Sequence, residues 1–119
     1  MKKIPGSICA PRGFKCAAVF CDIKKLGTGK GSDKGRKDDL ALIVSDVRAA
    51  VAGMFTTNQV CAAPVKVSRK VAAKNFARAI VVNSGNANAA TGEQGMRDAQ
   101  QMTQLAAKAV RSRRATPVA

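Results

Sequence analysis

The feature that most constrains this sequence is the small size of its apolar side chains. Hydrophobic residues make up 46% of the 119 positions, but only 3% are aromatic, and neither Trp nor Tyr occurs. Because small side chains bury little area each, a core of Val, Ala, Leu, Ile, Met and a few Phe gains limited hydrophobic stabilisation. A chain of this length forms one domain at most. We therefore expect a domain of marginal stability that a partner chain would help to cover.

Short apolar runs predict several strands. In residues 14–23 apolar side chains fall on both faces, as in a strand covered on two sides. The runs at 40–45, 49–57 and 79–82 are also typical of strands. Residues 24–39 place glycines among lysines and arginines, without the spacing of a phosphate-binding loop. We expect them to form a mobile, solvated hairpin loop, with solvated carboxylates at Asp33, Asp38 and Asp39.

Two helices are expected in the second half of the chain. After a turn at residues 62–65, Ser68 would cap a short helix that runs to about Asn75. Thr91 and Gln94 have the spacing of a capping box, and small or Met side chains recur every three or four residues over 93–111. Several strands followed by a long helix indicate an α+β fold, a layered α/β sandwich in one partial domain over residues 1–119.

The net charge of +14 arises from 21 Lys and Arg against 7 Asp and Glu. Nucleic acid, an acidic small molecule and an acidic partner surface would each suit this charge, and so would a solvated basic face. The absence of Tyr and Trp argues against base stacking. No acid lies between Asp46 and Glu93, whereas six cations do: Arg48, Lys66, Arg69, Lys70, Lys74 and Arg78.

The cysteines offer no metal or disulfide pattern. No C-x-x-C occurs and the chain has no His, which argues against structural zinc. Without an apolar signal segment or a membrane-length run, we expect a cytoplasmic protein with reduced thiols and no membrane. Each thiol would then be a small buried hydrophobe. The four are Cys9, Cys16, Cys21 and Cys61.

Residues 83–95 are the most informative segment for function. Three Asn and one Gly follow a predicted buried strand and precede a predicted helix. Amide side chains and glycine N–H groups can orient a polar substrate, although a well-capped turn uses the same residues. We predict that these residues bind the substrate or lie next to the active site: Asn83, Ser84, Gly85, Asn86 and Asn88. No catalytic residue emerges, because Thr56, Thr57 and Ser84 have no visible base.

Several motifs in order resemble one known family, that of the ornithine acetyltransferases (glutamate N-acetyltransferases). The motifs are FTTN at 55–58, AAPV at 62–65, AIVVNSGNANA at 79–89 and TGEQG at 91–95, with IKK at 23–25 and DLALI at 39–43 as opening segments. The resemblance runs from about residue 13 to 110. A single motif of this kind would be weak, but several in sequence are specific.

The resemblance implies a layered α/β enzyme of arginine biosynthesis that moves acetyl from N-acetylornithine to glutamate. It implies no resident cofactor, although some members take acetyl from acetyl-CoA. It implies a precursor that cleaves itself at an Ala–Thr bond, so that the new N-terminal Thr of the second chain is the nucleophile. It also implies an oxyanion hole from a Thr-Gly pair in the first chain, and a hetero-oligomer of both chain types.

The sequence departs from this family in three places. The loop at 26–38 is longer than expected, and Cys21-Asp22 stands where small residues are expected. After Val110, residues 111–119 do not match the oxyanion segment, and Thr116 precedes Pro117, which has no N–H. No catalytic residue of the family therefore maps onto the chain. We expect an N-terminal part that is inactive alone; the alternatives are a basic nucleic-acid-binding protein and a degenerate, non-catalytic homologue.

Overall fold

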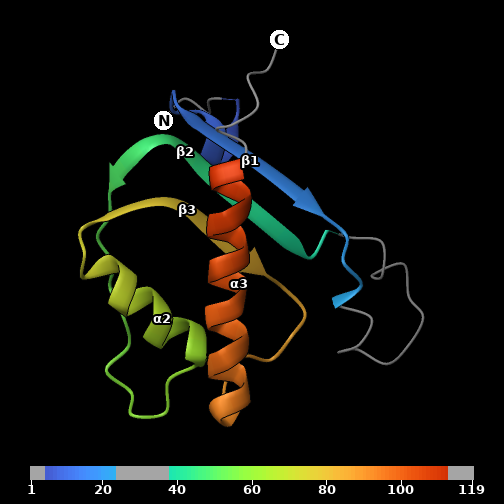
Figure 1. Ribbon diagram of the computed structural model, residues 1–119, viewed down its shortest axis with the longest axis vertical. Coiled ribbons are helices and arrows are strands. Elements are labelled where there is room, and N and C mark those ends of the chain that lie inside the picture. The colour runs from blue at the N-terminus through green and yellow to red at the C-terminus, as the bar shows by residue number, and fades with distance from the viewer. Residues whose placement is uncertain (1–4, 24–37, 113–119) are drawn as a thin grey trace.

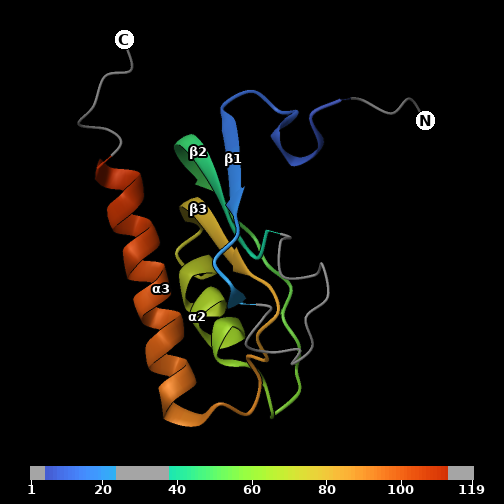
Figure 2. The same ribbon diagram turned by 90° about the vertical axis from the view of Figure 1, so that its right-hand side faces the viewer.

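A computed structural model describes residues 5–23 and 38–112 and places a three-stranded antiparallel sheet beside two α-helices. The strand order is β1-β2-β3, and both helices lie on the same side of the sheet (Figures 1 and 2). This arrangement confirms the predicted α+β layers and the long final helix. The elements are the 3-10 turn η1 (Ser7–Cys9), β1 (Phe14–Val19), β2 (Leu40–Ala50), α2 (Ala63–Ala72), β3 (Phe76–Asn83) and α3 (Gly92–Ser112).

The strand register divides the apolar residues between two faces. Ile43 of β2 pairs with Cys16 of β1 and Ile80 of β3, and its neighbour Leu42 pairs with Ala17 and Val81. Since successive side chains point to opposite faces, the Ile43 row and the Leu42 row lie on different sides. Ala77, Ala79, Ile80 and Val81 line a cavity with both helices, but Ile80 is also 56% exposed, and Phe76 and Val82 are 48% and 45% exposed. The helices therefore cover one face and leave the other open.

The strand predicted at 14–23 is shorter than expected, and it is not covered on two sides. β1 ends at Val19, and every residue in it is exposed. Its position at the edge of the sheet explains this result, because the helices pack beneath β3 and not beneath β1 (Figure 2).

The prediction of a separate strand at residues 49–57 is wrong. β2 instead runs through the predicted gap and ends at Ala50, after which residues 51–62 have no regular structure. A register shift between Val44 and Ala49 marks a bulge that allows the strand to continue. The guanidinium of Arg78 stabilises the bulge by donating to the carbonyl oxygens of Ser45, at 3.0 and 3.3 Å, and Asp46, at 2.8 Å.

The predicted start of the first helix is also wrong. The helix α2 begins at Ala63, where a turn was expected, and Ser68 lies in its interior. Pro64 occupies the first turn, where no backbone N–H is needed, so its fixed φ favours the helix. For α3 the predicted capping box is absent, because the amide of Gln94 donates to the Asp98 carboxylate at 2.7 Å and does not turn back toward Thr91.

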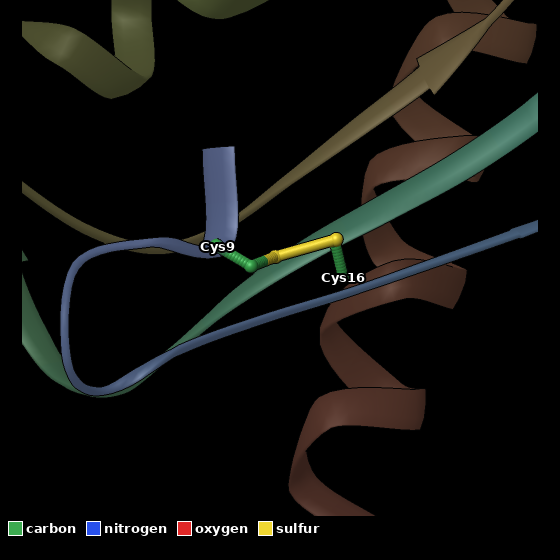
Figure 3. The surroundings of a disulfide bond; sticks show 2 residues. All are labelled: Cys9 and Cys16. Atoms are coloured by element: carbon green, nitrogen blue, oxygen red, sulfur yellow. A yellow bond between two sulfur atoms is a disulfide. The ribbon is translucent and has the colours of Figure 1, made fainter. Parts of the chain in front are cut away.

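The expectation of reduced, buried cysteines is wrong in two respects. Two of the cysteines form a disulfide, and a third is exposed. Cys9 and Cys16 form a disulfide that joins η1 to β1 (Figure 3). The short turn folds back beside the strand and brings the two Cα atoms to 6.4 Å, within the range that a disulfide spans. Cys21 is exposed, and Cys61 is partly buried.

The buried interior is small. Ala63 and Ala99 are the buried hydrophobic residues of the described ranges, each 8% exposed. Asp39, predicted to be solvated, is only 2% exposed, and two backbone hydrogen bonds to its carboxylate compensate the lost hydration. The glycine-lysine loop was predicted at residues 24–39, of which 24–37 lie outside the described residues. No helix in the part of the chain described is both long and apolar enough to span a membrane.

Candidate functional site

A cavity of about 400 Å³ lies where β3 ends and α3 begins. We call it the asparagine pocket. Asn83 at the end of β3 forms one wall together with Asn86 and Asn88 of the following loop, the first three turns of α3 form another, and Pro64 at the start of α2 closes a third side. Its lining residues are Pro64, Asn83, Asn86, Ala87, Asn88, Thr91, Gln94, Gly95, Asp98, Ala99 and Met102.

The structure brings together three of the five predicted site residues. Asn83, Asn86 and Asn88 line the pocket, whereas Ser84 and Gly85 do not. Gly85 has a φ of 95°, which favours glycine and turns the chain between the asparagines. Ser84 donates its backbone N–H to the carbonyl oxygen of Asp39 at 2.8 Å. These two residues therefore shape and anchor the loop that carries the asparagines.

The asparagine side chains are linked to one another. Asn88 Nδ2 donates to Asn83 Oδ1 at 3.2 Å, and Asn86 Nδ2 donates to Asn88 Oδ1 at 3.3 Å. Among the described residues, Asn83 Nδ2 and Asn86 Oδ1 make no side-chain hydrogen bond. The series therefore ends in one amide donor and one carbonyl acceptor beside the cavity, which is what recognition of a polar ligand requires.

Sequence reasoning missed the residues that α2 and α3 contribute to the pocket. Asp98 accepts a hydrogen bond from Gln94 at 2.7 Å, and Ala99 and Met102 form an apolar wall with Pro64. The four-residue spacing of Gln94 and Asp98 is typical of a pair on one helix face and was the one available signal. Pro64 meets Ala99 and Met102 only because α2 packs against α3, and this packing cannot be predicted from the spacing of residues within one helix.

The described residues contain no catalytic constellation. Thr56 Oγ1 accepts the N–H of Asn58 at 3.1 Å, in a local turn. No hydrogen bond links a Ser, Thr or Cys side chain to a carboxylate or amine base within these ranges. They also contain no group of three or more His, Cys, Asp or Glu side chains placed to bind a metal ion. The pocket can orient a small polar molecule. The Thr91 hydroxyl in its lining donates to the carbonyl oxygen of Asn88 at 3.5 Å and not to a base.

Three of the six cations between Asp46 and Glu93 are engaged within the domain. Arg78 holds the β2 bulge, and Arg69 donates to the Thr56 carbonyl at 2.8 Å while lying 5.6 Å from the Phe55 ring centroid. The Arg48 guanidinium lies 4.8 Å from the Phe76 ring centroid. These contacts stabilise loops and strands, so half of the basic residues that suggested an anion site have a structural role.

A second, mainly apolar cavity of about 250 Å³ lies between α2, α3 and β3. Val51, Phe55, Val71, Val81 and Met102 are among its lining residues. Its position between the helices and the sheet shows that the interior is incompletely filled.

Comparison with known proteins gives a consistent result. The sequence pattern of the ArgJ family matches residues 16–119, and so extends past residue 110, where the predicted resemblance ended. The arginine biosynthesis bifunctional protein ArgJ of Symbiobacterium thermophilum is 48% identical over 110 residues, covering 92% of this chain and 26% of the relative. The ArgJ protein of Lactococcus lactis is 46% identical over 108 residues, covering 91% and 25%. The chain thus spans about a quarter of the length of these relatives.

Two solved structures share the fold. The ornithine acetyltransferase of Mycobacterium tuberculosis, solved in complex with ornithine, superposes with a TM-score of 0.65 at 42% identity, over 76% of this chain and 42% of that chain. The ArgJ protein of Bacillus halodurans superposes with a TM-score of 0.64 at 36% identity, over 76% and 43%. The predicted fold class and the predicted family resemblance are both confirmed.

Proposed function

Since the chain belongs to the ArgJ family, we propose that it is the N-terminal portion of an acetyltransferase of arginine biosynthesis. The reaction is transfer of an acetyl group from N-acetylornithine to glutamate. The solved relative with bound ornithine supports an ornithine-type substrate. The observation that carries the proposal is the family match over residues 16–119 together with the asparagine pocket formed by its motifs.

In this proposal the asparagine pocket contacts or borders the substrate. Its linked amides leave a donor at Asn83 and an acceptor at Asn86, which suit the amide and carboxylate groups of an N-acylated amino acid. Ala99 and Met102 would contact the methylene groups of such a molecule. No resident cofactor is needed for this chemistry, and acetyl-CoA would act only as an alternative acetyl donor.

The nucleophile comes from the remainder of the protein. We propose that the precursor cleaves itself, and that the second chain provides an N-terminal Thr whose own amine acts as base. Two observations support a large covering partner: the relatives are about four times longer, and the open sheet face exposes Phe76, Ile80 and Val82. The complete enzyme would be a cytoplasmic hetero-oligomer, with neither a membrane nor a nucleic acid as partner.

A hybrid enzyme tests this function. The matched region of the S. thermophilum relative is replaced by this chain, and the hybrid is expressed in bacteria that require arginine because they lack ornithine acetyltransferase. We expect growth without arginine. We also expect no acetyl transfer by the purified 119-residue chain alone, because the described residues hold no nucleophile with a base. Turnover by that chain, or no growth with a soluble hybrid, would contradict the proposal.

A matched pair of variants tests the pocket in the hybrid. Asn88→Asp places an oxygen opposite Asn83 Oδ1 and removes the donor between them, so KM for N-acetylornithine should rise about tenfold. Asn75→Gly is the control, because Asn75 lies outside the pocket and its φ of 61° suits glycine. Equal kinetics for both variants would remove the pocket from the substrate site.

A further inference from the structure

The carboxylate of Asp39 makes unusual contacts for an acidic side chain in so thin a domain. The residue is 2% exposed, and its two oxygens accept the backbone N–H groups of Cys21 and Ile23, each at 2.7 Å. Burying a carboxylate is costly unless hydrogen bonds compensate, and bonds to an ionised acceptor are among the strongest. The side chain therefore fixes the segment after β1 against the residue that precedes β2.

The backbone of the same residue connects the ends of two strands. Its N–H donates to the carbonyl oxygen of Val19 at 3.1 Å, and its carbonyl oxygen accepts the N–H of Ser84 at 2.8 Å. The next residue, Leu40, pairs with both Val19 and Asn83. Asp39 thus lies at the junction of all three strands, at the position where the loop of the asparagine pocket leaves β3.

We propose that Asp39 is a positioning residue for the asparagine pocket, an inference that rests on the proposed function of that pocket. Its carboxylate, held by Cys21 and Ile23, fixes the orientation of the peptide whose carbonyl receives Ser84. Ser84 directly follows Asn83, so this bond sets where the loop begins and where its amides point. Asp39 contacts no pocket ligand itself; it acts through the backbone of Ser84.

Asp39→Asn isolates the carboxylate with almost no change in shape. The asparagine side chain has one acceptor oxygen, which can accept only one of the two backbone N–H groups. Its NH₂ group would face the other N–H, and because both are donors that hydrogen bond would be lost. Asp46→Asn is the matched control, because Asp46 is exposed and its carboxylate forms an ion pair with Lys15 at 3.2 Å. Both variants lose one negative charge, but only the first disturbs the junction.

Amide hydrogen exchange, followed by NMR or mass spectrometry in the hybrid and in the 119-residue chain, gives the first measurement. In Asp39→Asn the Ser84 amide should exchange about tenfold faster, while mid-sheet amides such as Leu42 keep their rates. Asp46→Asn should leave both unchanged. An unchanged Ser84 amide would overturn the proposal, and so would equal acceleration of every amide, which would make Asp39 a general stabilising residue only.

Kinetics of the hybrid give the second measurement. A displaced substrate loop should raise KM for N-acetylornithine about tenfold with kcat within about twofold, since the nucleophile lies elsewhere. A lower kcat at unchanged KM would overturn the positioning role. If the unmodified hybrid has no activity, the proposed function fails, and the exchange of Ser84 still decides whether Asp39 positions this loop.

Discussion

The two faces of the sheet have similar apolar residues but very different surroundings. On one face Ala77, Ala79 and Val81 lie against α2 and α3, and on the other Phe76, Ile80 and Val82 remain 45–56% exposed. A strand that is apolar on both sides normally lies between two covering layers. The comparison shows that the sequence of β3 specifies a two-sided environment, of which the described residues supply only one side.

The largest effect should come from a charge placed under the helices. Val81→Asp puts a carboxylate among apolar side chains of α2 and α3, which should cost about 3 kcal/mol and unfold so thin a domain. Ile80→Asp, one residue earlier on the open face, should cost less than about 1 kcal/mol in the 119-residue chain. Urea unfolding followed by circular dichroism measures both.

In the hybrid enzyme, the two substitutions Val81→Asp and Ile80→Asp test whether the remainder of the protein covers the open face. If the remainder of the protein covers the open face, Ile80→Asp should there become as damaging as Val81→Asp. Equal costs already in the 119-residue chain would mean that α2 and α3 do not distinguish the faces. A harmless Ile80→Asp in the hybrid would mean that the open face stays exposed.

A smaller effect is expected at Gly53, on the helix-covered side. A Cβ at this position would lie 2.7 Å from Cζ and 2.8 Å from Cε2 of the Phe55 ring. Gly53→Ala should therefore displace the ring from Arg69 and cost about 1–2 kcal/mol of unfolding free energy. Phe55→Leu in the same chain should recover part of that loss in a urea titration. An unchanged midpoint for Gly53→Ala would show that the ring is not held there.

The smallest effect, of opposite sign, is expected at Ala90, in the connection before α3. Its φ of 55° is unfavourable for a residue with a Cβ, and glycine adopts it freely. Ala90→Gly should stabilise the domain by about 0.5 kcal/mol, the relief of strain exceeding the added entropy of the unfolded chain. A lower thermal midpoint than that of the parent chain would contradict this expectation.

Local patterns predicted the elements whose stability is local. The repeat of small and Met side chains located α3, and the apolar run at 79–82 located β3. The strand at 49–57 failed because a bulge and the long-range contacts of Arg78 decide where β2 bends and ends. Asp39 looked solvated because its neighbours in sequence are polar. Its burial depends on backbone groups 16 and 18 residues away.

The candidate site was predictable to a similar degree. The density of turn residues identified Asn83, Asn86 and Asn88, because such residues rarely cluster without a geometric reason. Pro64 and Met102 could not be assigned to the same cavity, since only the packing of α2 against α3 brings them near the loop. The Cys9–Cys16 disulfide was missed for a related reason: spacing alone did not show that η1 folds back along β1.

The length of α3 determines how far from the asparagine pocket the polypeptide leaves this helix. Its 21 residues rise about 31 Å, so the chain passes the asparagine pocket at Gly95 and leaves the helix at its far end. From Gly95 to the end of α3 the helix rises about 26 Å. An extended residue advances at most about 3.5 Å, so a group that follows α3 needs a return path of at least about seven residues to reach the pocket at Gly95. The helix and the returning segment would then run in opposite directions, and each residue inserted in α3 beyond the pocket would lengthen that return path by about 1.5 Å.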